Sequence, residues 1–88
     1  MTLEKLKENI IYWAVPEYLY SINEGLKPNA YIIFENYNNC EFFYLDEKGE
    51  RIGYNTFKNI EEAYEVLWNK LYKEMQRPPS IPPPSVYG

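Results

Sequence analysis

The sequence predicts an α+β fold in the order α-β-β-β-β-α, an antiparallel β-meander packed with two helices. Residues 31–57 contain three runs rich in aromatic and β-branched side chains, separated by Asn38-Asn39 and by residues 46–50. Such runs between turn-forming residues are typical of consecutive antiparallel strands. On either side of the meander, residues 3–13 and 60–75 carry apolar side chains at helical spacing.

Size and composition indicate one small globular domain. The chain has 88 residues, of which 45% are hydrophobic and 18% aromatic. A domain of this length buries only about 60–65% of its unfolded surface, so we expect a small margin of stability. Ten residues are tyrosine, which is enriched at protein interfaces and is equally suited to a half-buried strand. We assign residues 1–77 to a single domain and residues 78–88 to a proline-rich tail.

The charge of the chain constrains its partners. Its net charge is −4, from 9 basic and 13 acidic residues, which disfavours direct nucleic-acid binding because phosphate backbones attract Lys and Arg. It favours a basic protein partner, although a modest negative charge also serves solubility. No apolar run approaches the roughly 20 residues that span a membrane, and the N-terminus lacks the apolar region of a signal peptide. We therefore expect a cytoplasmic protein without membrane contact.

The first third of the chain predicts a helix and a short strand. Thr2 is a helix cap, and four apolar residues then form one stripe: Leu3, Leu6, Ile10 and Trp13. Because Pro16 disfavours helical geometry at the preceding residue, the helix should end near Ala14 or Val15. Alternation over residues 18–23 predicts a strand, and Gly25 and Pro28 predict the loop that follows it.

The sequence of the meander also predicts which residues of neighbouring strands pair with each other. If Asn38-Asn39 forms a two-residue hairpin loop, Tyr37 faces Cys40 and Ile33 faces Tyr44. One face then collects the natural core, Ile32, Phe34, Phe43 and Leu45. The other face is mixed and holds Tyr31, Ile33, Glu35, Tyr37, Cys40, Phe42, Tyr44 and Asp46. A four-residue loop, residues 47–50, pairs Asp46 with Arg51 and places Ile52 and Tyr54 on the core face. We expect both helices to pack on one face of the sheet.

The C-terminal third predicts a second helix and a tail. Asn59 is a good N-cap, and Glu62 three residues later gives a capping-box-like pattern. The helix stripe consists of Ile60, Ala63, Tyr64, Leu67, Leu71 and Met75. Pro78 limits continuation of the helix, and five prolines among residues 78–84 favour a polyproline-like tail. Pro79-x-x-Pro82 fits the minimal motif that aromatic grooves bind, and the alternative is a plain tail.

The residues predict no catalytic, cofactor or metal site. The chain has no histidine and one cysteine, Cys40, so the commonest general base and a zinc-ligand cluster are both missing. The Asp46-Glu47 pair is explained by a turn and the Glu61-Glu62 pair by a helix start. Glycosidic chemistry with such carboxylates would need a cleft between large lobes. We therefore expect a protein that is not an enzyme.

Acidic and aromatic residues around the meander predict a surface for a protein partner. Aromatic anchors in an acidic field suit a Lys/Arg-rich protein surface. In the alternative, the tyrosines pack against a helix and the acids are only solvated. The predicted partner-binding residues are Glu24, Tyr31, Glu35, Tyr37, Tyr44, Asp46, Glu47 and Glu50.

Three segments together resemble a known family. They read Y-S-I-N-E-G-L-K-P-N-A-Y-I-I at 20–33, D-E-K-G-E-R-I-G at 46–53 and F-K-N-I-E-E-A-Y-E-V-L at 57–67. They are similar to small immunity proteins of bacterial polymorphic and contact-dependent toxin systems. The likeness covers roughly residues 1–75 and excludes the tail. This chain departs from the family pattern at Glu24, where a small residue is expected, and at Ile52, which separates Arg51 from Gly53.

The resemblance implies a cytoplasmic antitoxin that binds one cognate toxin C-terminal domain, often a nuclease, and blocks it without catalysis. The charge of the chain adds the expectation that this domain is basic. The resemblance implies no particular contact residues, because such proteins use diverse surfaces. The alternative is a small adaptor that presents its proline-rich tail to a partner groove.

Overall fold

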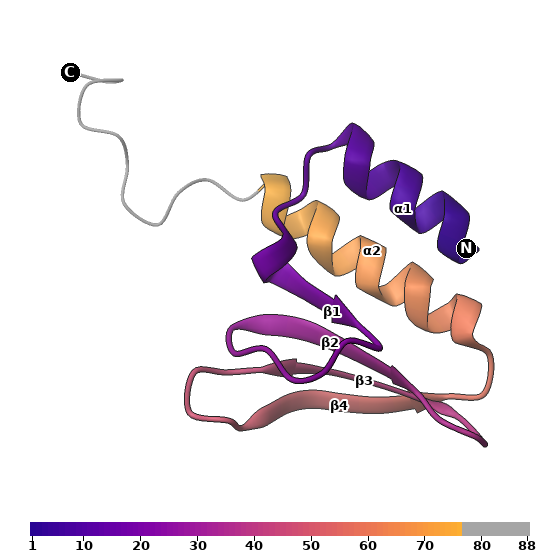
Figure 1. Cartoon of the computed structure of the whole chain (residues 1–88), viewed down its shortest axis with the longest axis vertical. Helices are drawn as coiled ribbons and strands as arrows, with labels where there is room; N and C mark the ends of the chain where they lie inside the picture. The colour runs from indigo at the N-terminus through magenta and orange to yellow at the C-terminus, as the bar shows by residue number, and fades with distance from the viewer. Residues whose placement is uncertain (77–88) are drawn as a thin grey trace.

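A computed structural model describes residues 1–76 and has an α+β fold with a four-stranded mixed sheet (Figure 1). The strands lie in the order β1-β2-β3-β4. Both helices contribute to one hydrophobic cluster with the sheet residues Ile33 and Phe42, so they cover the same face, as predicted. The predicted tail, residues 78–88, lies outside the described residues. The elements are α1 (Leu3–Tyr12), the 3-10 turn η1 (Glu17–Leu19), β1 (Tyr20–Ile22), β2 (Ala30–Glu35), β3 (Cys40–Leu45), β4 (Arg51–Phe57) and α2 (Ile60–Gln76).

The first strand differs from the prediction in length and direction. A strand forms within the predicted residues 18–23, although β1 has only three residues. The prediction of a fully antiparallel meander is wrong, because β1 pairs in parallel with β2, Tyr20 opposite Tyr31. A parallel neighbour requires the chain to return along the strand before pairing. Because β1 has only three residues, the loop of residues 23–29 is long enough to return the chain to the start of β2. Asn23 and Asn29 at the two ends of this loop have φ of 56° and 59°, which lets the chain reverse at each end.

The β2–β3 hairpin has a longer loop than predicted. Glu35 pairs with Cys40 and Ile33 with Phe42, so residues 36–39 form a four-residue loop and the two-residue prediction is wrong. The Asn36 carboxamide oxygen accepts hydrogen bonds from the backbone N–H groups of Asn38 and Asn39, at 3.3 and 3.0 Å. This side chain stabilises the wider turn. Because the register moves by two residues, the side chains within β2 and β3 keep their predicted faces.

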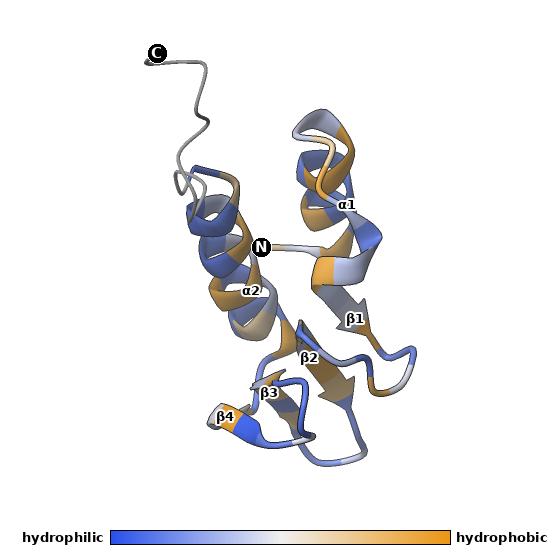
Figure 2. Cartoon of the chain, turned by 90° about the vertical axis from the view of Figure 1, so that its left-hand side faces the viewer, coloured by the Kyte–Doolittle hydropathy of each residue, from blue (hydrophilic) through white to orange (hydrophobic). Residues whose placement is uncertain are grey.

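The helices cover the face that the sequence analysis regarded as mixed. Ile33 and Phe42 are buried there with Leu6 of α1 and Leu67 of α2. The predicted core face holds a separate, smaller buried cluster of Ala30, Ile32, Phe43 and Leu45, with Phe34 packed beside it. The choice of face was therefore wrong, although the sorting of side chains between the faces was right. In Figure 2 both helices carry hydrophobic residues beside hydrophilic ones, which is typical of helices covered on one side.

A β-bulge separates Ile52 from Tyr54. Leu45 pairs with Arg51, not Asp46, and the loop comprises residues 46–50. Tyr44 then pairs with Ile52, and Phe42 with Asn55, so β4 has one extra residue. Gly53 at this point has φ of +67°, which favours glycine. As a result Ile52 faces α2 beside Tyr44, whereas Tyr54 stacks on Phe43 across the sheet with centroids 6.0 Å apart. The prediction that Ile52 and Tyr54 share a face is wrong.

Both helices begin where the sequence predicts. The Thr2 hydroxyl accepts a hydrogen bond from the N–H of Lys5 at 3.1 Å, and the Asn59 side chain accepts one from the N–H of Glu61 at 2.9 Å. Each cap pairs a backbone donor that the helix itself leaves without a partner. Along α2 the residues buried in the core are Ala63, Tyr64, Leu67 and Leu71.

The end of α1 contains a strained alanine. The N–H groups of Val15 and Ala14 donate to the carbonyls of Ile10 and Ile11 at 2.9 and 3.1 Å, which is a Schellman motif. The left-handed position of this motif is Ala14, with φ of 52°, where glycine avoids the clash of a Cβ.

We expect Ala14→Gly to raise the free energy of unfolding by about 1 kcal/mol, because it removes this clash and leaves both hydrogen bonds in place. Urea unfolding followed by circular dichroism measures the difference. Ala14→Val is the matched opposite change, since a β-branched residue is more strained at positive φ, and should lower the unfolding midpoint. An Ala14→Gly variant less stable than the parent would contradict the account.

Cys40 is buried at the hairpin end of β3. Burial, with the nearby carboxylates of Glu35 and Glu41, raises the pKa of its thiol from 9.0 to about 11. Because the folded state keeps its proton where the unfolded chain loses it, this contribution to stability is complete below pH 9 and disappears as the pH rises through 11.

We therefore expect native Cys40 to react with a thiol reagent such as DTNB at least about a hundredfold more slowly than Cys40 of the urea-unfolded chain at the same pH, since the thiolate fraction falls tenfold for each pKa unit. Equal rates in the folded and unfolded protein would show that the thiol is accessible and unperturbed. The same midpoint of urea unfolding at pH 8 and pH 10.5 would contradict the predicted loss of stability.

Candidate partner-binding cleft

The eight predicted partner-binding residues lie in two groups at opposite ends of the sheet. Glu35 and Tyr37 lie at the β2–β3 hairpin, and Glu24 lies near them because Asn23 accepts a hydrogen bond from the N–H of Glu35 at 2.6 Å. The second group is at the other end of β3, about 20 Å away for a six-residue strand. The structure thus does not bring the predicted residues together in one patch. The second group consists of Tyr31, Tyr44, Asp46, Glu47 and Glu50.

The hairpin group is a sparse surface. Tyr37 is fully exposed, with 100% of its side-chain surface open to solvent. Glu24 and Glu35 are exposed as well. Glu35 and Tyr37 line a hollow of about 460 Å³ at the hairpin, but Tyr37 is the one aromatic residue in its lining. The second group differs in this respect.

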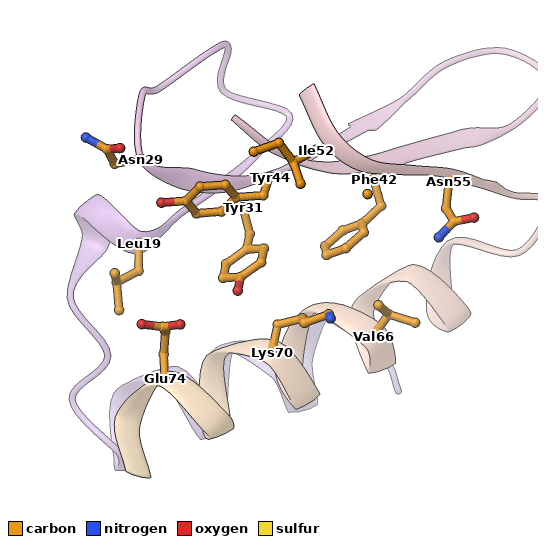
Figure 3. Close-up of a pocket in the computed structure, with 11 residues that line it drawn as sticks. Leu19, Asn29, Tyr31, Phe42, Tyr44, Ile52, Asn55, Val66, Lys70 and Glu74 are labelled. Atoms are coloured by element: carbon orange, nitrogen blue, oxygen red, sulfur yellow. The ribbon is translucent and has the colours of Figure 1, made fainter. Parts of the chain in front are cut away.

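Tyr31 and Tyr44 form the floor of an open cleft together with Phe42 (Figure 3). The rings of Tyr31 and Tyr44 meet edge to face with centroids 5.0 Å apart, and those of Tyr31 and Phe42 lie nearly parallel at 6.0 Å. Edge and offset ring contacts of this kind add to the energy of simple burial. Tyr31 comes from β2 and the other two rings from β3, so strand pairing fixes this aromatic floor.

Helix α2 forms a wall of the cleft beside this aromatic floor. Val66, Lys70 and Glu74 are spaced four residues apart and therefore project from one side of the helix. Ile52 and Asn55 of β4 close the cleft opposite them, and its volume is about 480 Å³. In the view of Figure 3 the Tyr31 hydroxyl points toward α2 between Lys70 and Glu74. The cleft combines an apolar floor with charged groups at its rim, which is the usual composition of a binding site.

The acidic loop 46–50 adjoins one end of this cleft, since Tyr44 and Ile52 flank it in sequence. Its first residue has a structural role: the Asp46 carboxylate accepts hydrogen bonds from the N–H groups of Lys48 and Glu50 at 2.9 and 2.8 Å. Glu47 and Glu50 are exposed, so their charges are available to a partner. Asp46 therefore stabilises the turn, and the exposed carboxylates of Glu47 and Glu50 make the electrostatic potential beside the cleft more negative.

Sequence reasoning missed the residues that β4 and α2 contribute to the cleft. Ile52, half exposed at 50%, was assigned to the core because the bulge at Gly53 was not foreseen. Val66, Lys70 and Glu74 were not considered because they lie beside the buried stripe of α2, not in it. Their spacing of four residues was a visible signal, but it had meaning only once the covered face of the sheet was known.

Other chemistry in residues 1–76 is limited. Three or more His, Cys, Asp or Glu side chains that could together hold a metal ion do not occur in this part of the chain. The Tyr54 hydroxyl donates a hydrogen bond to a Glu41 carboxylate oxygen at 2.8 Å, and this bond raises the pKa of the exposed phenol. None of the helices described is long and apolar enough to cross a membrane. Two other hollows on the described residues, of about 380 and 460 Å³, have one aromatic ring each in their lining, whereas the cleft has three.

Comparisons with models of protein families, with curated proteins and with solved structures found no significant match. The proposals below therefore rest on the geometry of this chain and on the sequence resemblance given above.

Proposed function

We propose that this protein is an immunity protein that neutralises a cognate bacterial toxin domain, possibly a nuclease in class, by non-catalytic binding in the cytoplasm. The observation that carries the proposal is the aromatic cleft of Tyr31, Phe42 and Tyr44 beside the acidic residues Glu47 and Glu50. The sequence resemblance to immunity proteins supports the same class of function. The partner is a basic protein domain, not nucleic acid.

The cleft suits a basic segment for two physical reasons. The faces of tyrosine rings attract the guanidinium of Arg or the ammonium of Lys, and the long apolar stems of these residues pack on the rings. The net charge of −4 and the exposed acids near the cleft raise the rate of encounter with a positively charged partner. Lys70 at the rim disfavours a cation in its immediate vicinity, which directs the basic groups toward the loop 46–50.

A co-expression rescue tests the proposal. The proposal expects a toxin gene beside the gene for this protein. The C-terminal domain that this neighbour encodes is induced in bacteria with and without this protein, and growth is followed. We expect growth to be restored only when this protein is present, and the two proteins to co-purify. A toxic domain that is neither bound nor neutralised would overturn the proposal.

Charge reversal then tests the role of the acidic loop. We expect Glu47→Lys with Glu50→Lys to weaken binding of the toxin domain by roughly tenfold or more in 50 mM salt, mainly through a slower association rate. Asp46 is left unchanged in this variant, because reversal at Asp46 would break the turn that its carboxylate stabilises. Surface plasmon resonance measures both rate constants.

The matched control is Glu24→Lys with Glu35→Lys at the other end of the sheet, which changes the net charge equally. An equal loss in both double variants would assign the effect to overall charge, and a loss in the control alone would place the contact at the hairpin end. Either result would remove the acidic loop from the contact surface without affecting the rescue.

A further inference from the structure

Strand β4 forms one edge of the sheet along its whole length. It is the longest strand, with seven residues (Arg51–Phe57), and β3 is its one strand partner among the described elements. In Figure 1 the side of β4 away from β3 borders no other labelled element. An edge of this kind presents backbone donors and acceptors that can pair with a further strand.

The hydrogen bonds of the hairpin indicate which backbone groups of β4 point outward. The Asn36 N–H donates to the Asn39 carbonyl at 2.9 Å. Because bonded and non-bonded pairs alternate along antiparallel strands, the backbone groups of the next residue, Cys40, point toward β4 and bond its partner there, Phe57. The N–H and carbonyl of Thr56, one residue earlier in β4, therefore point away from β3.

The edge has little of the protection that natural sheets give to exposed strands. Residues 51–57 contain no proline and one charged side chain, Arg51. The guanidinium carbon of Arg51 lies 4.9 Å from the ring centroid of Phe43, so this charge is held over a face of the sheet. The bulge at Gly53 is a protective feature, but the residues after it pair regularly with β3. The apolar side chains of Ile52 and Tyr54 are both half exposed, at 50% and 49%.

The charges beside the two ends of β4 favour a second copy of the chain as the occupant. Two identical strands that pair antiparallel are related by a twofold axis. Full overlap of residues 51–57 places this axis at Tyr54, and pairing residue by residue then sets Glu50 of each copy opposite Lys58 of the other. Both side chains are exposed, and neither forms an ion pair within residues 1–76. Opposite charges across paired strands are stabilising.

The neighbouring registers lack this complementarity. An axis at Gly53 would set Lys48 opposite Lys58, and like charges in this position are destabilising. An axis at Asn55 would move Glu50 away from Lys58 and shorten the overlap of the strands. The register with the longest overlap is therefore also the one with two ion pairs.

We propose that the chain forms a twofold dimer in which β4 pairs antiparallel with β4 of a second copy, with Glu50 and Lys58 opposite each other at both ends. The two sheets then become one continuous sheet, and because its twofold axis is perpendicular to it, the helices of both copies cover the same side. Ile52 and Asn55 line the partner-binding cleft, so the two clefts face each other across the paired β4 strands. The assignment does not rest on the proposed function, and its test needs no toxin.

Sedimentation equilibrium of the full-length chain tests for the dimer. We expect the mass to rise from that of one chain toward that of two between about 10 μM and about 1 mM protein, since a small interface gives a weak dimer. Salt of about 0.15 M screens the repulsion between two chains of like net charge. A chain that keeps the mass of one copy up to about 1 mM would overturn the proposal.

A charge exchange tests the register. Lys58→Glu sets like charges opposite each other twice and should weaken dimerisation by roughly tenfold. The double variant E50K/K58E forms both pairs again with their charges exchanged, and should return to within about threefold of the parent. Lys7→Glu is the matched control, because it makes the same charge change at an exposed position of α1. Equal weakening by Lys58→Glu and Lys7→Glu, or no recovery in E50K/K58E, would overturn the assignment.

Amide hydrogen exchange locates the contact within the chain. At the higher protein concentration the outward N–H of Thr56 should exchange at least about threefold more slowly, because it gains a partner in the second copy. The N–H of Phe57, which points toward β3, should exchange at the same rate at both concentrations. A dimer in which exchange at Thr56 does not depend on concentration would place the contact on another surface and overturn the pairing of β4.

Discussion

Leu67→Ala is expected to lower the free energy of unfolding by about 3 kcal/mol, within the range for leucine truncation in a protein core. Leu67 has 0% of its surface exposed and lies in the cluster that contains Leu6 and Ile10 of α1 and Ile33 and Phe42 of the sheet. Removing its isobutyl group therefore reduces the buried apolar area and leaves a cavity between the two helices and the sheet. The whole free energy of unfolding of a small domain is only about 5–10 kcal/mol. The melting temperature should therefore fall by on the order of 15 °C.

Leu26→Ala is the matched control, since the same atoms are removed from a side chain that is 57% exposed in the β1–β2 loop. We expect a loss below about 0.5 kcal/mol for this change. Urea unfolding of both variants should show a lower midpoint for Leu67→Ala with an unchanged slope. Similar midpoints for the two variants would mean that the helix–sheet cluster is not the main core of the domain.

The elements of this fold were largely predictable because each depends on local chemistry. Thr2 and Asn59 are caps whose side chains bond to nearby N–H groups, and the stripe around Leu67 follows from helix period alone. The alternation of Ile32 and Ile33 between two faces of the sheet follows from strand geometry in the same way. Signals of this kind act within a few residues, so a single sequence carries them.

The pairing of the elements was less predictable because it depends on contacts between distant residues. The parallel pairing of Tyr20 with Tyr31 and the helix-covered face of Ile33 are settled by tertiary packing, since both faces of the hairpin are apolar enough to be core. The bulge at Gly53 had a local signal, an isolated glycine in a strand pattern, which was read as a departure from a family motif. That one extra residue decided whether Ile52 belongs to the core or to the cleft.

The candidate site was predicted in its residue types and only partly in its geometry. Tyr31, Tyr44, Glu47 and Glu50 lie near one another because β2, β3 and the loop 46–50 meet at one end of the sheet. Glu35 and Tyr37 were added to the same patch because they are close in sequence to these strands. A β-strand separates its two ends by its full length, so sequence proximity misleads most along a strand.

Tyr44→Ala is expected to weaken binding of the toxin domain by about thirtyfold, which corresponds to about 2 kcal/mol and is typical of an interface hot spot. The reason is position: Tyr44 is half-buried on the cleft floor against Tyr31, with centroids 5.0 Å apart, and adjoins the acidic loop. Such a ring presents a large rigid surface that a basic side chain can cover without ordering a flexible group. Isothermal titration calorimetry with the toxin domain measures the change.

Tyr37→Ala removes the same group from the fully exposed hairpin position and should change the affinity by less than twofold. Because Tyr44 also contributes to packing, urea unfolding of the Tyr44→Ala variant must show that it remains folded at the temperature of the titration. A folded Tyr44→Ala variant with parental affinity would exclude the cleft as the contact surface. If Tyr37→Ala were the weaker binder of the two, the contact would lie at the hairpin, where the exposed Glu24 and Glu35 would supply the negative field instead.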